Sequence, residues 1–128
     1  MIFRMEGTVM ADIYFTLTGT QYHYGKDFLE VEMRVMLEKE PDNEYDKEAI
    51  QVKVEGLGCI GYVANSSRTV VGESYSAGRL YDKIGDRAVG KVLYVMSKGV
   101  LCKLSKKSLV TEEPEDIQIQ IQEDIIDE

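Results

Sequence analysis

Residues 40–46, with the sequence Glu-Pro-Asp-Asn-Glu-Tyr-Asp, combine side chains that can do chemistry in one short turn. A chain reversal needs only Pro41, which fixes one dihedral, and Asn43, which tolerates a left-handed conformation. Asp46 can accept amide hydrogens within such a turn, so a purely structural role stays open. Tyr45 and the clustered carboxylates exceed what a turn needs, and they favour a ligand site as the alternative.

Residues 85–92 match the spacing of a phosphate-binding loop as far as Gly90 and Lys91. Val92 then stands where such a loop needs a Ser or Thr hydroxyl for magnesium. The residues after Lys91 indicate a strand, whereas the phosphate cradle needs a helix N-terminus. The pattern therefore does not predict nucleotide binding.

The residues that most often bind metals or act as nucleophiles are few. His23 is the only histidine, and its neighbours Tyr22 and Tyr24 favour a surface loop. Cys59 and Cys102 lack the paired spacing of a zinc site, and no Ser or Cys stands in a nucleophile-elbow context. Their apolar surroundings favour buried free thiols over a disulfide or a reactive thiol. We expect no metal, no cofactor and no enzymatic activity.

The formal charge of -8 is unevenly distributed along the 128 residues. Residues 1–55 hold 6 Lys/Arg and 12 Asp/Glu, residues 56–111 hold 9 and 3, and residues 112–128 hold 0 and 8. The first 111 residues are therefore neutral together, and a polyanionic partner is compatible with them. Indiscriminate coating of DNA is not expected, because it needs a broadly basic surface.

The composition predicts one soluble domain. A chain of this length can bury one hydrophobic core. It contains no apolar run of about 18 residues that could span a bilayer, and its N-terminus lacks the features of a signal peptide. We expect a cytoplasmic protein without a membrane partner.

Aromatic and β-branched residues, alternation of apolar with polar residues, and turn residues between these segments together predict a strand-dominated chain. Strands are expected at 12–18, 31–38, 50–55, 59–64, 88–96 and 100–104. Glycines at 56 and 58 favour a hairpin between the third and fourth strands, and Lys98 with Gly99 favours another between the last two. Capping residues at 65–67 and at Ser76 predict two short helices. The expected fold is mainly β with two short helices, a small closed or partly open β-barrel over residues 12–108.

The two ends of the chain differ from this body. Residues 1–11 are interpreted as a loose lead-in, and residues 109–128 as an acidic tail. Within the tail, Ile117–Gln122 alternates strictly between Ile and Gln. An added edge strand, a contact between subunits that would form a homo-oligomer, and disorder all stay open.

Three segments resemble the HIRAN domain in order and spacing. They are residues 16–25 (Thr-Leu-Thr-Gly-Thr-Gln-Tyr-His-Tyr-Gly), residues 40–46 followed by Ala49-Ile50, and residues 60–63 (Ile-Gly-Tyr-Val). The resemblance extends over about residues 13–105. The chain looks like a free-standing bacterial version of a module whose best-understood members are fused to helicase-like ATPases or nucleases of DNA repair.

The resemblance implies an OB-like β-barrel that binds DNA, in some members by capturing the 3′ end of a single strand. Tyr22 and Tyr45 match positions that contact the terminal nucleotides, where base stacking contributes about 1–3 kcal/mol per base. Asn43 matches a position that lines the same pocket. Asp46 would accept a hydrogen bond from a 3′-hydroxyl and repel an internal phosphodiester.

This sequence departs from the family at three positions that bind phosphate. Gln21 stands where DNA-binding members have Arg, and Tyr62 and Asn65 stand where they have His and Lys. Each lost cation weakens binding and reduces its salt dependence. Cations of the second half could compensate, namely Arg68, Arg79, Lys83, Arg87 and Lys91.

The sequence thus predicts a non-enzymatic nucleic-acid-binding module that captures the 3′ end of single-stranded DNA in repair or replication, beside a helicase or nuclease partner. The alternative is a protein-interaction adaptor that keeps the fold without binding DNA. A third hypothesis has the acidic tail cover the basic half as a mimic of nucleic acid. The candidate binding residues are Gln21, Tyr22, Asn43, Tyr45, Asp46, Tyr62 and Asn65.

Overall fold

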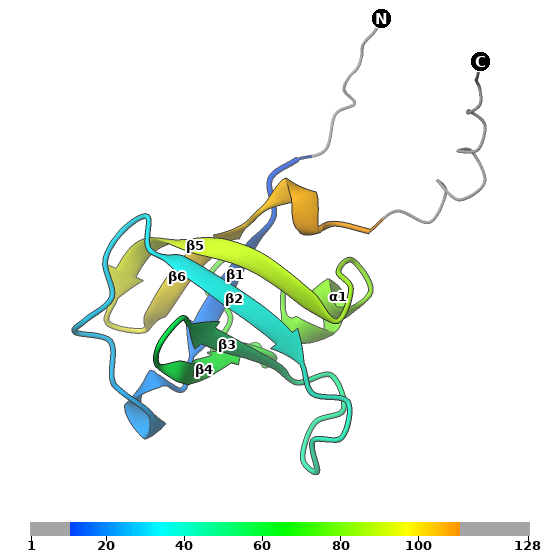
Figure 1. Cartoon of the computed structure of the whole chain (residues 1–128), viewed down its shortest axis with the longest axis horizontal. Coiled ribbons are helices and arrows are strands. Elements are labelled where there is room, and N and C mark those ends of the chain that lie inside the picture. Colours follow the sequence, from blue (N-terminus) through cyan, green and yellow to red (C-terminus); the bar gives the residue numbers. More distant parts are fainter. Residues whose placement is uncertain (1–10, 111–128) are drawn as a thin grey trace, which may run out of the picture.

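Six antiparallel strands close into a barrel in the order β1-β4-β3-β2-β5-β6 (Figure 1). The structure is a computed structural model, and it describes residues 11–110. The strands are β1 (Tyr14–Thr18), β2 (Arg34–Lys39), β3 (Ile50–Val54), β4 (Gly58–Val63), β5 (Arg87–Met96) and β6 (Gly99–Leu104). The helices are η1 (Thr20–Tyr22), α1 (Ala77–Tyr81) and η2 (Lys106–Ser108). The predicted mainly β barrel is confirmed.

The alternation of the strands builds the core of the barrel. Val35 and Leu37 of β2 point inward and are fully buried, as are Val92 of β5 and Cys102 of β6. Their polar neighbours point outward, as period-two geometry requires. The register shifts after Val52 and again after Val92, and such bulges bend strands so that the sheet can close.

The predicted start of the second strand is wrong by three residues. Val31 was expected to face the core, but its side chain is 57% exposed. Glu32 adopts a left-handed conformation with φ of 76°, and its amide donates to the carbonyl of Val92 at 2.8 Å. Because this conformation interrupts the extended chain, β2 begins only at Arg34.

The helix predicted from the caps at residues 65–67 does not form, and residues 66–73 make turns and bends instead. The hydroxyl of Ser66 accepts from the amide of Arg68 at 3.0 Å, and its carbonyl accepts from Val70 at 2.9 Å. The amide of Val71 then donates to the buried hydroxyl of Thr16 at 3.0 Å. This bond to β1 takes the chain away from a helical path.

The other predicted helix is confirmed as α1. The hydroxyl of Ser76 accepts from the amide of Arg79 at 3.3 Å, which is the expected N-cap bond. Ala77 and Leu80 are fully buried in the core cluster. The helix is therefore fixed to the barrel by its apolar face.

The two ends of the described chain lie beside η2, at one end of the barrel (Figure 1). The alternating segment Ile117–Gln122 and nearly all of the predicted lead-in fall outside the described residues. Among residues 11–110, no helix is long and apolar enough to cross a membrane.

Candidate nucleic-acid interface

The turn between β2 and β3, residues 40–48, is held together by its own side chains. The Asn43 carbonyl oxygen accepts from the amides of Tyr45 at 2.8 Å and Asp46 at 3.0 Å. Its amide nitrogen donates to Glu40 Oε1 at 3.0 Å. The side chain of Asn43 therefore sets the conformation from which Tyr45 projects.

Asp46 connects this turn to two other segments. Its Oδ1 accepts from the Glu48 amide at 2.9 Å, which confirms the predicted turn bond. Its Oδ2 accepts from Asn65 Nδ2 at 2.9 Å, and Asn65 Oδ1 accepts from the amide of Gly78 in α1 at 2.9 Å. An ionised carboxylate has about four acceptor sites, so Asp46 keeps capacity for a ligand.

Tyr62 of β4 donates its hydroxyl to both oxygens of Glu40, at 3.0 and 3.1 Å. Burial, followed by the hydrogen bond to Glu40, raises the pKa of Tyr62 to about 12, so the phenol stays a donor at neutral pH. Glu40 thereby accepts from both Tyr62 and Asn43. Sequence reasoning did not single out Glu40, although it opens the polar turn and directly precedes Pro41.

The helix η1 presents Gln21 and Tyr22 beside β4. It follows Gly19, whose φ of 79° favours glycine. The ring of His23, the residue after η1, lies 6.4 Å from the ring of Tyr62. A Cβ at Gly61 would meet the Thr18 carbonyl at 2.6 Å, so the absence of a side chain there permits this close approach.

The seven predicted residues fall into two groups. Asn43, Tyr45, Asp46, Tyr62 and Asn65 belong to one hydrogen-bonded network that includes Glu40, and Tyr45 enters it through its backbone. Within the described chain, Gln21 and Tyr22 have no hydrogen bond to this network and approach it only through the contact of His23 with Tyr62. Both key rings are exposed, Tyr22 to 81% and Tyr45 to 93%.

A model of the HIRAN domain family matches residues 10–122. The chain belongs to this family. HIRAN domains are generally non-catalytic modules that bind nucleic acid.

Two solved structures resemble this HIRAN domain. The HIRAN domain of human HLTF is 18% identical, with a TM-score of 0.49 over 73% of this chain and 74% of that one. A protein from Lactobacillus plantarum is 24% identical, with a TM-score of 0.47 over 74% of this chain and 97% of that one. A search of the curated proteins found no match.

The turn of this HIRAN domain is strongly acidic. Residues 40–48 contain five carboxylates and a single cation, Lys47. An internal phosphate placed there would be repelled, so the turn is unsuited to holding a phosphate backbone. Arg79, one candidate, stacks over the ring of Tyr75 at 4.1 Å, whereas Arg87 and Lys91 lie on β5.

Metal binding and thiol chemistry have little support among the described residues. Within residues 11–110, no group of three or more His, Cys, Asp or Glu side chains is placed to hold a metal ion. Cys59 and Cys102 are free thiols, the first half-buried and the second buried. Burial raises the pKa of both thiols, that of Cys102 to about 12, which lowers their reactivity.

Proposed function

We propose that this HIRAN domain binds single-stranded DNA by its free 3′ end, at the site formed around Tyr22, Tyr45 and Asp46. The observation that supports this most is a pair of exposed aromatic rings together with a carboxylate whose orientation is set by hydrogen bonds from Glu48 and Asn65. A domain that recognises strand ends would serve DNA repair or replication.

Each group has a distinct part in this proposal. Tyr45 and Tyr22 stack on the terminal bases, because every base offers an aromatic face. Asp46 accepts a hydrogen bond from the 3′-hydroxyl and repels a phosphate in that position. Asn43 acts through the turn, since its side chain already bonds to Glu40 and to the amides of Tyr45 and Asp46.

Two of the three neutral residues that stand where DNA-binding members have cations make hydrogen bonds within this chain. Tyr62 donates to Glu40, and Asn65 joins Asp46 to α1. Gln21 is exposed and has no charge to offer. Binding at this site should therefore depend on stacking and on the terminal hydroxyl, and only weakly on salt.

The test compares three labelled DNAs of one sequence by fluorescence anisotropy: a single strand with a 3′-hydroxyl, the same strand with a 3′-phosphate, and a blunt duplex. We expect the tightest binding to the 3′-hydroxyl strand. Equal affinity for all three DNAs, or no binding to any of them, would refute end capture.

A further inference from the structure

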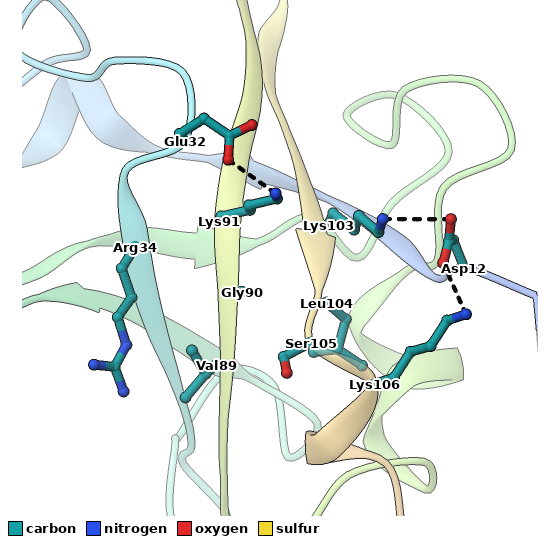
Figure 2. A pocket seen from close by; sticks show the side chains of 10 residues that line it. All are labelled: Asp12, Glu32, Arg34, Val89, Gly90, Lys91, Lys103, Leu104, Ser105 and Lys106. Carbon is teal, nitrogen blue, oxygen red and sulfur yellow. Dashed lines mark hydrogen bonds and ion pairs between the residues drawn. The ribbon is translucent and has the colours of Figure 1, made fainter.

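Three cations stand directly opposite one another on neighbouring strands of the barrel. Arg34 of β2 pairs in register with Lys91 of β5, and Lys91 pairs in register with Lys103 of β6. All three side chains belong to the outward set of their strands, since Val35, Val92 and Leu104 beside them are buried. Figure 2 shows them across one side of the barrel.

Such a row works against the stability of the sheet, because like charges directly opposite on paired strands repel. Two acids relieve the repulsion in part: Glu32 lies 2.9 Å from Lys91, and Asp12 lies 3.4 Å from Lys103. Within residues 11–110, no carboxylate lies within 4.0 Å of the Arg34 guanidinium. The row therefore has uncompensated positive charge.

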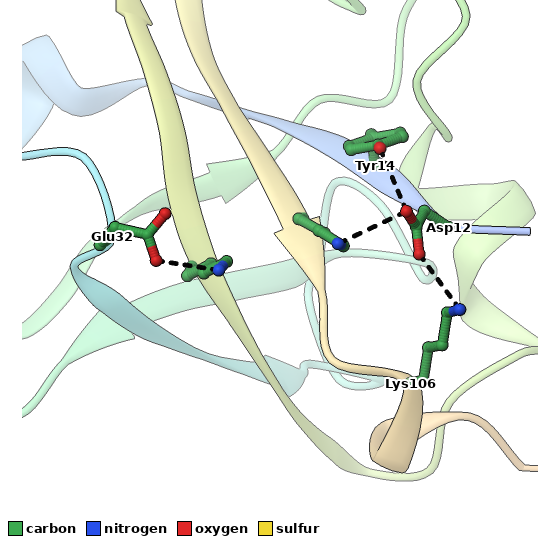
Figure 3. A network of polar contacts seen from close by, with 6 residues as sticks. Asp12, Tyr14, Glu32 and Lys106 are labelled. Carbon is green, nitrogen blue, oxygen red and sulfur yellow. Dashed lines mark hydrogen bonds and ion pairs between the residues drawn. The ribbon is translucent and has the colours of Figure 1, made fainter.

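Asp12 is shared between two lysines, since Lys106 of η2 also lies 3.3 Å from its carboxylate (Figure 3). These contacts with Lys106 and Lys103 keep the pKa of Asp12 below its ordinary value. The ion pairs are solvent-exposed, and exposed pairs contribute little to stability. A stronger anion can therefore displace them at small cost.

The row borders two hollows on the same side of the barrel. One, of about 550 Å³, is lined by Arg34, Lys91, Lys103 and Lys106, and the other, of about 530 Å³, adds further cations and also includes Arg34. We call this surface the basic face. Its cations are Arg34, Lys53, Arg87, Lys91, Lys103, Lys106 and Lys107, and its acids are Asp12, Glu32 and Glu38.

We infer that the basic face is a second nucleic-acid site, which holds the phosphate backbone of a polynucleotide along its length, without regard to sequence or to ends. The seven cations outnumber the three acids, so the basic face has positive charge for several phosphates. Among residues 11–110, no aromatic ring lines either hollow, so these residues offer no platform for bases. Backbone contacts of this kind position a strand and do not select a sequence.

The inference does not rest on end capture, and a DNA without ends separates the two sites. The probe is a covalently closed single-stranded circle, titrated with the full chain at several salt concentrations. The test variant is Arg34→Gln with Lys103→Gln. The matched control is Lys47→Gln with Lys98→Gln, which removes the same charge from exposed positions outside the basic face.

We expect the full chain to bind the circle and the test variant to bind it with a salt slope lower by about 1.4, since each lost contact to a single strand removes about 0.7. If both binding curves meet at 1 M salt, this corresponds to about 25-fold weaker binding at 0.1 M. The control should keep the affinity of the parent. Thermal unfolding of both variants checks the fold, and removing the repulsion between Arg34 and Lys91 should not lower stability.

Two results would overturn the inference: no binding of the full chain to the circle, or equal weakening in the test and control variants. Binding to the circle without any preference for a 3′-hydroxyl would refute end capture and leave the basic face in place. The two proposals therefore fail on different DNAs.

Discussion

The turn at residues 40–48 and the basic face are opposites in charge and in construction. The turn has five carboxylates and one cation, and side-chain bonds to nearby amides hold its shape. The basic face has seven cations and three acids, and the register of paired strands places its central row. The turn projects from the barrel away from η2, whereas the basic face includes residues of η2 (Figure 1).

The difference shows why two tasks of one binding protein need separate surfaces. Discrimination of a 3′-hydroxyl from a phosphate needs a negative charge at the contact, and retention of a backbone needs positive charge. Oppositely charged groups in one place would neutralise each other, because exposed charges within about 8 Å interact at physiological salt. Under the two proposals, the turn provides selectivity and the basic face provides affinity.

The largest effect on DNA affinity should come from replacing cations of the basic face with acids, which gives this face the charge of the turn. Changing Lys91→Glu and Lys103→Glu alters the charge of the central row by four. Two lost contacts lower the salt slope by about 1.4, and repulsion by the new carboxylates adds to the loss, so we expect binding of a closed circle to weaken by more than about 25-fold at 0.1 M salt. The ratio of affinities for 3′-hydroxyl and 3′-phosphate strands should stay unchanged. A change in this ratio as large as the change in affinity would show that the two regions are not separate.

The converse change neutralises Asp46, the acid of the turn that is proposed to contact the 3′-hydroxyl. Asp46→Asn keeps the size of the side chain but loses the charge that repels a 3′-phosphate. The preference for the 3′-hydroxyl should fall by roughly tenfold or more, which is the scale of a hydrogen bond to a charged group. Asp42→Asn, at an exposed acid of the same turn, is the matched control. If both variants lose the preference equally, general repulsion by the turn, and not Asp46, selects the end.

Stacking provides a test that leaves charge untouched. Tyr45→Ala should weaken binding of the 3′-hydroxyl strand by about 1–3 kcal/mol, the contribution of one stacked base. Binding of the closed circle should not change. The control is Tyr94→Ala on β5, where the ring is 62% exposed. Equal losses in the two variants would argue against a specific role for Tyr45.

Removal of residues 112–128 sharpens the contrast by deleting eight acids and no cation. Val110, the last described residue, lines the hollow that contains Arg87 and Lys107. We expect the shortened chain to bind the closed circle a few-fold more tightly at low salt, with the difference fading at high salt. Unchanged affinity would exclude the tail as a competitor for the basic face. Light scattering of both chains tests a role of the tail in assembly.

The sequence predicts best those features that depend on residues close together in the chain, such as strands and turns. Alternation, β-branched and aromatic composition, and turn residues together located all six strands, and the turn bond of Asp46 to Glu48 follows from local chemistry. The start of β2 and the missing helix at residues 65–67 were predicted wrongly because of the left-handed Glu32 and the distant Thr16, neither of which a periodic pattern reveals.

The candidate sites show the same limit. Tyr62 and Asn65 entered the prediction through family resemblance, since their contacts with the turn join residues far apart in the chain. The row on the basic face depends on strand register, which no composition count can provide. Lys91 was named among the candidate cations, but Arg34 and Lys103 were not.

The smallest expected effect concerns the bond that fixes Tyr62 to the turn. Because the pKa of Tyr62 is raised to about 12, the folded state favours the neutral phenol, and this contribution to stability is complete below the ordinary pKa of about 10. It is lost as pH rises from about 10 through about 12. Phenolate absorbance should show one late-titrating tyrosine, which Tyr62→Phe removes. Glu40→Gln should shift that step to lower pH only in part, because burial, the largest single cause, remains. A full return to the ordinary pKa in Glu40→Gln would instead make the acidic turn itself the source of the shift.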